Sequence, residues 1–250
     1  MDTDDANAAV RLQKFLSEAG KCSRRQGEAW IAEGRVDVNG ETAHLGQKID
    51  PEHDKVYVDG RRVQYAPQKL ETIVLAMNKP RGVLCTNADP HGGQTVFDLV
   101  PPEWMGGRLF CAGRLDKDSE GLVILTNNGE LNQRLTHPSN GVIKRYRVRI
   151  HRTFEPEDIP KMLRGVTREG ERLSARKVIP SPGNNEEARH RLEIHLNQGR
   201  KREIRRLLEA FGYLVERLER VQIGRFELKR LPRGAVRPLS QKEVGLLLVN

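Results

Sequence analysis

The sequence predicts an α+β protein that consists of a small N-terminal domain and a larger C-terminal domain. Strand and helix signals mix along the 250 residues without the regular strand–helix–strand order of a parallel sheet. A short polar segment that contains a proline, residues 66–69, separates the two parts. With 31% charged and 37% hydrophobic residues, the chain has the composition of a folded globular protein rather than a disordered one.

Two short helices open the N-terminal domain. Apolar residues three and four positions apart predict a helix over residues 12–19, which ends at Gly20. Ser23, with Gln26 three residues later, has the spacing of a capping box. It predicts the start of a second helix, which ends at Gly34.

Two hairpins follow these helices. Residues 36–38 and 56–58 have valines in strand alternation, and each run is followed by a turn-forming pair, Asn-Gly at 39–40 and Asp-Gly at 59–60. Two helices and a small twisted sheet form a module of about 55 residues, which is small but able to fold.

The C-terminal domain is predicted to be built on a largely antiparallel sheet rather than a doubly wound one. Strand signals lie at residues 73–77, 122–125, 146–150 and 192–196. One helix is expected to begin at Asn127, with Glu130 three positions later, and to end at His137 before a proline. A second is expected over residues 204–211, ended by Gly212.

Several classes of protein are disfavoured by the sequence. The longest apolar runs are far shorter than the roughly 18 residues of a membrane span, and the acidic start does not have the pattern of a signal peptide. The three cysteines, Cys22, Cys85 and Cys111, are widely spaced and suggest neither a disulfide framework nor a zinc clip. We therefore expect a cytoplasmic protein with reduced thiols.

The positive charge is concentrated toward the C-terminus. The net charge is +9, and residues 140–240 carry 25 Lys and Arg against 13 Asp and Glu. Such a concentrated surplus favours a polyanionic partner, although a solvated basic surface is an alternative at this point. The two N-terminal helices and the turn between them carry a second basic cluster, Arg11, Lys14, Lys21, Arg24 and Arg25.

A charged loop, residues 113–120, leads directly into the predicted core strand at 122–125. It carries three acids and two bases, with Gly113 at its start and Gly121 directly after it. Loops held on rigid strands commonly position catalytic groups. The alternative is a surface turn whose Asp and Ser side chains bond their own backbone.

Two stretches resemble known protein families. Residues 9–65 are similar to the alpha-L RNA-binding module of a small-subunit ribosomal protein and some tRNA synthetases, most of all at residues 23–25 and 34–40. Residues 113–126 resemble the signature of the pseudouridine synthases, in particular the RsuA/RluB/RluF family that modifies ribosomal RNA. Further motifs of that family match in the same order at residues 78–83, 126–131, 144–146 and 199–206.

The resemblance implies a domain plan. An alpha-L RNA-binding domain would span residues 9–66, and a pseudouridine synthase domain with a central cleft would span residues 70–240. Two departures from the family pattern are small: Ser119 replaces a frequent Thr, and Gln198 replaces a frequent Glu. Neither removes a group that the chemistry requires.

The resemblance also implies roles for individual residues. Asp116 would be the catalytic carboxylate, Arg205 would form the ion pair that keeps it charged, and Tyr146 would stack on the target uracil. The uridine would be flipped out of its stack, and Arg114 would fill the vacated space or grip the backbone. Further RNA contacts are expected from Lys79, Arg200, Lys201, Arg202 and Arg206, and from the N-terminal basic cluster of Arg11, Lys14, Lys21, Arg24 and Arg25. No redox change or group transfer from outside occurs in this isomerisation, so neither a cofactor nor a metal is expected.

The substrate and the activity leave alternatives open. Residues 89–98 are RluB-like, and residues 116–119 and 216–220 are RluF-like; both subfamilies act on large-subunit ribosomal RNA. The alternatives are the same reaction on small-subunit RNA, a non-catalytic RNA-binding assembly factor, and a glycosidase that releases free uracil. We expect a monomer that does not bind a membrane.

Overall fold

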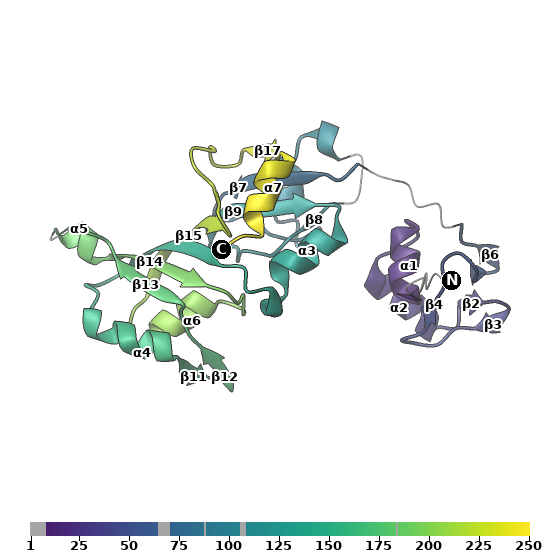
Figure 1. The fold of residues 1–250 in the computed structure, drawn as a ribbon, viewed down its shortest axis with the longest axis horizontal. Helices are drawn as coiled ribbons and strands as arrows, with labels where there is room; N and C mark the ends of the chain where they lie inside the picture. Colours follow the sequence, from purple (N-terminus) through teal and green to yellow (C-terminus); the bar gives the residue numbers. More distant parts are fainter. Residues whose placement is uncertain (1–8, 65–70, 88, 106–108, 184) are drawn as a thin grey trace, which may run out of the picture. The chain divides into compact units, whose positions relative to one another are not determined.

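The computed structural model describes residues 9–64, 71–87, 89–105, 109–183 and 185–250. The chain divides into two compact units, residues 1–70 and 71–250, which Figure 1 shows in sequence colours. The predicted linker at residues 66–69 lies outside the described residues.

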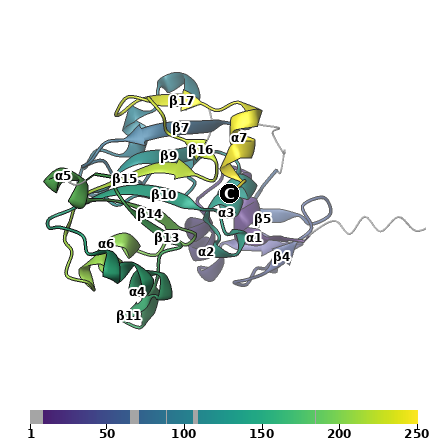
Figure 2. The same ribbon diagram turned by 60° about the vertical axis from the view of Figure 1, so that its left-hand side comes forward.

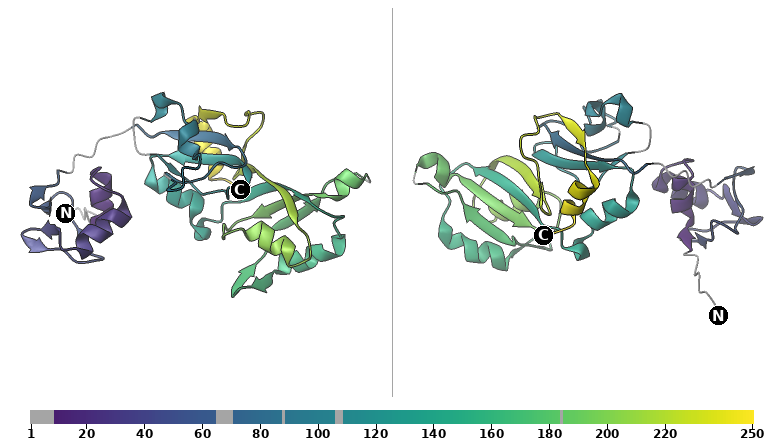
Figure 3. Two further views of the ribbon diagram at one scale, coloured as in Figure 1. Left: turned by 180° about the vertical axis from the view of Figure 1, so that it is seen from behind. Right: turned by 45° about the horizontal axis from the view of Figure 1, so that its top comes forward.

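The N-terminal unit has the two helices and the small sheet that the sequence predicts (Figure 3). Its elements are β1 (Val10–Arg11), α1 (Leu12–Glu18), α2 (Arg24–Ala32), β4 (Lys48–Ile49) and a sheet in the order β3 (Glu41–Thr42), β2 (Val36–Val38), β5 (Val56–Val58), β6 (Arg61–Arg62). The Ser23 side chain accepts a hydrogen bond from the backbone N–H of Gln26, which confirms the predicted cap of α2. Asn39 and Asp59 have positive φ values of 56° and 49°, as the predicted tight turns require.

A single large sheet forms the frame of the C-terminal unit. Its strand order is β13 (Lys177–Pro180), β14 (Arg191–Leu196), β10 (Lys144–Ile150), β15 (Val215–Ile223), β9 (Glu120–Thr126), β7 (Val74–Lys79), β17 (Val236–Pro238), and Figure 2 shows these strands side by side. Two short strands, β8 (Phe110–Cys111) and β16 (Phe226–Glu227), pair with β9 and β15. Among the described strand pairs of this sheet, only β15–β9 is parallel, which confirms the predicted α+β class.

Both faces of the sheet centre are covered. Leu75 and Met77 of β7 point into one apolar cluster, which includes α6 (Glu203–Glu209) and Met162 of α4 (Ile159–Arg164). Their neighbours Val74 and Ala76 point into a second cluster with α3 (Gly129–Thr136) and α7 (Gln241–Leu247). Further elements are α5 (Glu186–Arg189) and a hairpin of β11 (Val166–Arg168) and β12 (Glu171–Leu173). The described part of this unit also contains the short 3₁₀ helices η1 (Val96–Leu99), η2 (Pro102–Trp104), η3 (Pro138–Asn140) and η4 (Pro156–Asp158). A central strand such as β7 therefore has no face left for solvent.

Two expectations differ in detail from the structure. Helix α3 is capped by Asn128, which accepts from the Leu131 N–H, whereas the Asn127 side chain accepts from the Ile73 N–H and so ties β9 to the start of β7. The C-terminal unit also continues beyond residue 240, because α7 packs against the sheet through Leu247. Within the described ranges, every helix is too short or too polar to cross a bilayer.

Candidate active site

The loop that carries Asp116 is fixed at both ends and in its middle. Leu115 is buried in the main core, and the Ser119 N–H closes a turn onto the Asp116 carbonyl at 3.1 Å. The Gly82 N–H donates to the Lys117 carbonyl at 2.7 Å, which ties the loop to the segment after β7. Asp116 itself is half-buried. The backbone that carries the Asp116 side chain is therefore fixed by contacts of the loop rather than left as a free turn.

An open cavity of about 480 Å³ lies at this loop. Its lining residues are Arg81, Gly82, Asp116, Lys117, Asp118 and Arg202. Three cations and two carboxylates thus share one cavity that is large enough for a small organic group. The cationic side chains of such a cavity can bind a phosphate group while a carboxylate contacts another part of the same molecule.

Arg205 contacts the loop at Asp118 and not at Asp116, the carboxylate that we expected. Its Nη2 atom lies 3.2 Å from Oδ2 of Asp118 and donates to the Asp118 carbonyl at 3.2 Å, and its Nη1 atom donates to the Val215 carbonyl at 2.9 Å. The predicted ion pair between Arg205 and Asp116 is therefore replaced by one with Asp118. Burial lowers the pKa of Arg205, while the charges of Asp118 and Asp116 oppose that effect.

Arg202 forms a second contact between the loop and the start of α6. Its Nη1 atom lies 3.3 Å from both carboxylate oxygens of Asp118. The residue has a positive φ of 51°, a conformation that few residues other than glycine adopt. Asp118 thus joins the loop that carries Asp116 to two arginines of one turn.

Tyr146 is in the core rather than at the cavity. It lies on β10 opposite Arg220 of β15, only 7% of it is exposed, and it belongs to the main apolar cluster. It is not one of the side chains that line the cavity beside Asp116. Stacking on uracil stays a prediction that requires this ring to become accessible.

Lys79 cannot make the RNA contact that we expected, because it is fully buried at the end of β7. Its Nζ atom donates to the Pro80 carbonyl at 2.8 Å. Burial lowers its pKa, opposed by the charges of several groups that include Asp118 and Asp116. Lys79 is therefore a cation behind the loop, not on the RNA-facing surface.

The other predicted RNA contacts divide into exposed and engaged side chains. The exposed ones are Arg11, Lys21, Arg24, Arg25, Arg114, Lys201 and Arg202, although Arg202 also pairs with Asp118. Lys14 is half-buried and lies 3.7 Å from Glu18, and the Arg200 side chain donates to Gln198. Part of the basic surplus is also paired: Arg145 lies 2.8 Å from Glu227.

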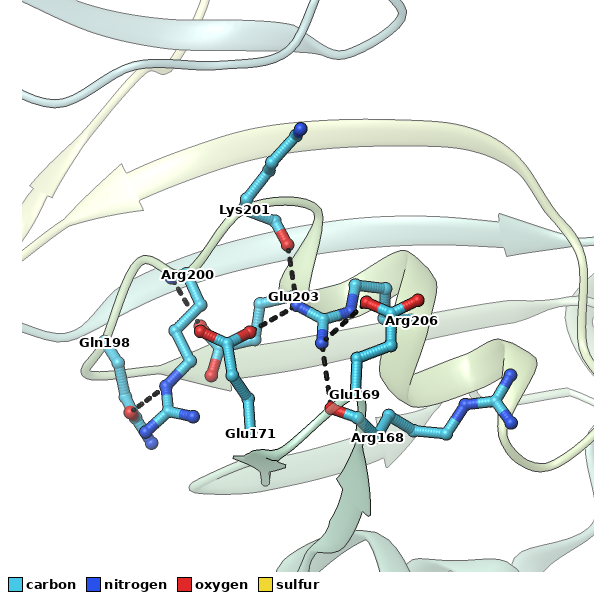
Figure 4. Close-up of polar contacts among 8 residues, drawn as sticks. All are labelled: Arg168, Glu169, Glu171, Gln198, Arg200, Lys201, Glu203 and Arg206. Carbon is cyan, nitrogen blue, oxygen red and sulfur yellow. Dashed lines mark hydrogen bonds and ion pairs between the residues drawn. The ribbon is translucent and has the colours of Figure 1, made fainter.

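Arg206 is engaged rather than free for RNA (Figure 4). Its guanidinium forms ion pairs with Glu171 and Glu169 and donates to the carbonyl of Arg168 at 3.1 Å. It thereby ties the β11–β12 hairpin to α6, one residue along from Arg205. The expected phosphate contact of Arg206 is replaced by this anchor.

Replacing Arg206 by Ala is expected to release the hairpin without unfolding the domain. Trypsin cleavage after Arg168 or Arg172 should accelerate about tenfold, the equivalent of about 1.4 kcal/mol of local opening free energy. Mass spectrometry of timed digests measures this rate. Arg202→Ala is the matched control, since Arg202 contacts Asp118 and not the hairpin. Equal cleavage rates in the two variants would mean that Arg206 does not hold the hairpin.

Lys144 is expected to make the stability of the domain depend on pH. Burial, together with the charge of Arg220 and opposed by Glu203, lowers the pKa of Lys144 from 10.5 to about 8. Between these two values the unfolded chain binds more protons than the folded one, so the free energy of unfolding should rise with pH. The full shift corresponds to about 3 kcal/mol.

Urea unfolding of the wild type and of Lys144→Met at several pH values tests this expectation. We expect the variant to lack the rise between pH 8 and 10.5. Parallel pH profiles for the two proteins would contradict the assignment to Lys144.

Three residues that line the cavity were not predicted as site residues from the sequence: Arg81, Lys117 and Asp118. Arg81 was readable as a basic residue inside the 78–83 motif, and Lys117 and Asp118 as charged neighbours of Asp116. Only the tertiary contacts with α6 distinguish Asp118 from an ordinary surface acid.

The cavity places the carboxylate of Asp116 among three cations, a combination that is typical of enzymes that bind and act on a polyanion. Residues 73–210 match the family described as RNA pseudouridylate synthase, and residues 10–54 match the S4 domain. The ribosomal large subunit pseudouridine synthase B of Vibrio cholerae is 42% identical over 240 residues, which cover 95% of this chain and 74% of that protein.

Two further comparisons agree. An uncharacterized RNA pseudouridine synthase of Aquifex aeolicus is 40% identical over 95% of this chain and 93% of its own length. A crystal structure of a pseudouridylate synthase has a TM-score of 0.67 at 29% identity, over 95% of this chain and 99% of that one. The chain belongs to the RNA pseudouridylate synthase family, with an S4 RNA-binding domain at its N-terminal end.

Proposed function

We propose that this pseudouridine synthase isomerises a uridine of large-subunit ribosomal RNA, with Asp116 as the catalytic carboxylate. The observation that carries the proposal is the cavity in which Asp116 lies among Arg81, Lys117 and Arg202. The similar protein of Vibrio cholerae is named as a large-subunit synthase, which supports that choice of RNA.

The reaction requires an ionised carboxylate close to the anomeric carbon of the target nucleotide. Asp116 can act there as a nucleophile, or it can stabilise developing positive charge and remove a proton. The uridine must leave its stack to reach the cavity, at a cost of a few kcal/mol. Phosphate contacts from Arg81, Lys117 and Arg202 would offset that cost.

Other side chains support this chemistry indirectly. Arg205 holds the loop through Asp118, and its charge acts on Asp116 from a distance. Tyr146 would stack on the freed uracil once entry of the nucleotide uncovers its ring. One chain carries the S4 domain and the whole cavity, so we propose a monomer that acts on ribosomal RNA in the cytoplasm.

Unmodified transcripts of both ribosomal RNAs, incubated with the full-length protein and mapped by carbodiimide adducts, test the proposal. We expect one new pseudouridine, in the large-subunit RNA. A site in the small-subunit RNA would overturn the choice of substrate. Binding without product would favour an assembly factor, and an abasic site would favour a glycosidase.

A further inference from the structure

Two cysteines lie in contact behind the catalytic loop. Cys85 follows β7 in the chain, Cys111 ends β8, and both are half-buried free thiols. The Cys111 thiol hydrogen-bonds to Cys85. The backbone N–H of Leu115 also donates to Sγ of Cys85 at 3.4 Å. Because Leu115 directly precedes Asp116, this sulfur supports the backbone that carries the catalytic carboxylate.

Two buried cations lie near these sulfurs. Arg220 is 2% exposed; its Nε atom donates to the Leu122 carbonyl at 2.7 Å, and its Nη2 atom has no hydrogen-bond partner in the described structure. Lys79, which is fully buried, also acts on Cys85 through its charge. Buried cations are costly unless an anion lies close by. A thiolate at this point would supply that negative charge.

The surroundings favour negative charge on Cys85 rather than on Cys111. Cys85 accepts hydrogen bonds from both the Cys111 thiol and the Leu115 N–H. These bonds and the charges of Arg220 and Lys79 lower the pKa of Cys85 despite its burial. The bond to Cys85 and burial raise the pKa of Cys111. The pair therefore combines a nucleophilic thiolate with a neighbouring protonated thiol.

We propose that Cys85 and Cys111 form an oxidisable dithiol, a modification site for hydroperoxides that is built against the catalytic loop. The Cys85 thiolate attacks the peroxide, the O–O bond breaks, and a sulfenic acid forms as hydroxide leaves. Cys111 then loses its proton and attacks this sulfur, which forms the S–S bond and releases the second oxygen as water. The peroxide gains two electrons, and the two thiols lose them.

Oxidation would change the support of the catalytic loop. The disulfide is uncharged, so Arg220 loses its anion and the Leu115 N–H loses its strong acceptor. The S–S bond, at about 2.05 Å, also draws the Cys85 segment closer to β8 than a thiol contact does. Asp116 is one residue from Leu115, so we expect its position and the activity to change.

The full-length wild-type protein tests the proposal directly. After brief treatment with hydrogen peroxide and alkylation of the remaining thiols, we expect a peptide map to show Cys85 linked to Cys111. Cys22, in the N-terminal unit, is the internal reference and should stay alkylated. Absence of the linked peptide, or oxidation of Cys22 as fast as of Cys85, would overturn the proposal.

Two variants separate the steps of the reaction. Cys111→Ser should stop at a sulfenic acid on Cys85, which dimedone traps, whereas Cys85→Ser should leave Cys111 unlabelled. Dimedone labelling of Cys111 in Cys85→Ser would reverse the assigned roles and overturn the assignment of Cys85 as the nucleophile.

Activity on ribosomal RNA tests the link to the loop. We expect the fully cross-linked enzyme to lose at least about tenfold in rate and to regain it on reduction with dithiothreitol. The double variant without both cysteines should show no response to peroxide. A cross-linked enzyme with unchanged activity would contradict the coupling, and this result does not depend on whether large-subunit RNA is the natural substrate.

Discussion

Asp116→Asn is expected to abolish pseudouridine formation while the protein still folds and binds RNA. The substitution keeps the shape of a half-buried side chain but removes the charge that the reaction requires. A loss of this group should lower the rate at least about 10³-fold. Single-turnover assays measure the chemical step, and RNA binding is measured separately.

Asp118→Asn is the matched comparison for this variant. Asp118 lies two residues away in the same cavity, but its oxygens face Arg202 and Arg205. Its loss should misplace the loop and lower the rate about tenfold, far less than the change at Asp116. If Asp116→Asn kept substantial activity, or if Asp118→Asn lost more activity than Asp116→Asn, the assignment of the chemistry to Asp116 would be wrong.

Gly121→Ala is expected to destabilise the catalytic domain by about 3–5 kcal/mol, because two costs add at one position. Gly121 has a φ of +102°, and a Cβ atom there would lie 2.3 Å from the backbone carbonyl oxygen of Arg220. This is the place where β9 and β15 pair in parallel, directly after the loop that carries Asp116. Chemical unfolding of purified protein measures the loss.

Gly245→Ala is the control for that prediction. Gly245 lies in α7, nothing lies within 4 Å of the Cβ atom it would gain, and its φ is not positive. Alanine at a helix position should raise stability by about 0.5–1 kcal/mol. If both alanine variants unfold like the wild type, the close approach of β9 and β15 does not require glycine at position 121.

Local rules explain why much of the fold could be predicted from the sequence. Ser23 caps a helix because its side chain reaches an N–H three residues later, and Asn39 and Asp59 turn because each tolerates a positive φ. The alternation in β10 is visible because one of its faces is wet. Helix α7 was missed, although Ser240 and Glu243 have the spacing of a capping box.

The site could be predicted only in part, because its contacts are tertiary. Asp116 and Asp118 are two residues apart in a turn, and spacing does not show which carboxylate faces α6. Lys79 reads as a surface cation, but it ends a strand whose two faces are both covered, so its side chain is buried. The approach of Cys85 to Cys111 depends on the position of β8 beside β9 and could not be inferred from the sequence.

The most direct test of the role of Asp116 is a crystal structure of the Asp116→Asn enzyme bound to its ribosomal RNA substrate. We expect the target uridine outside its stack, with its anomeric carbon about 3–3.5 Å from the side chain of residue 116. A uridine that stays stacked in the RNA, or one that lies against Asp118 or Glu120 instead, would contradict the central role of Asp116.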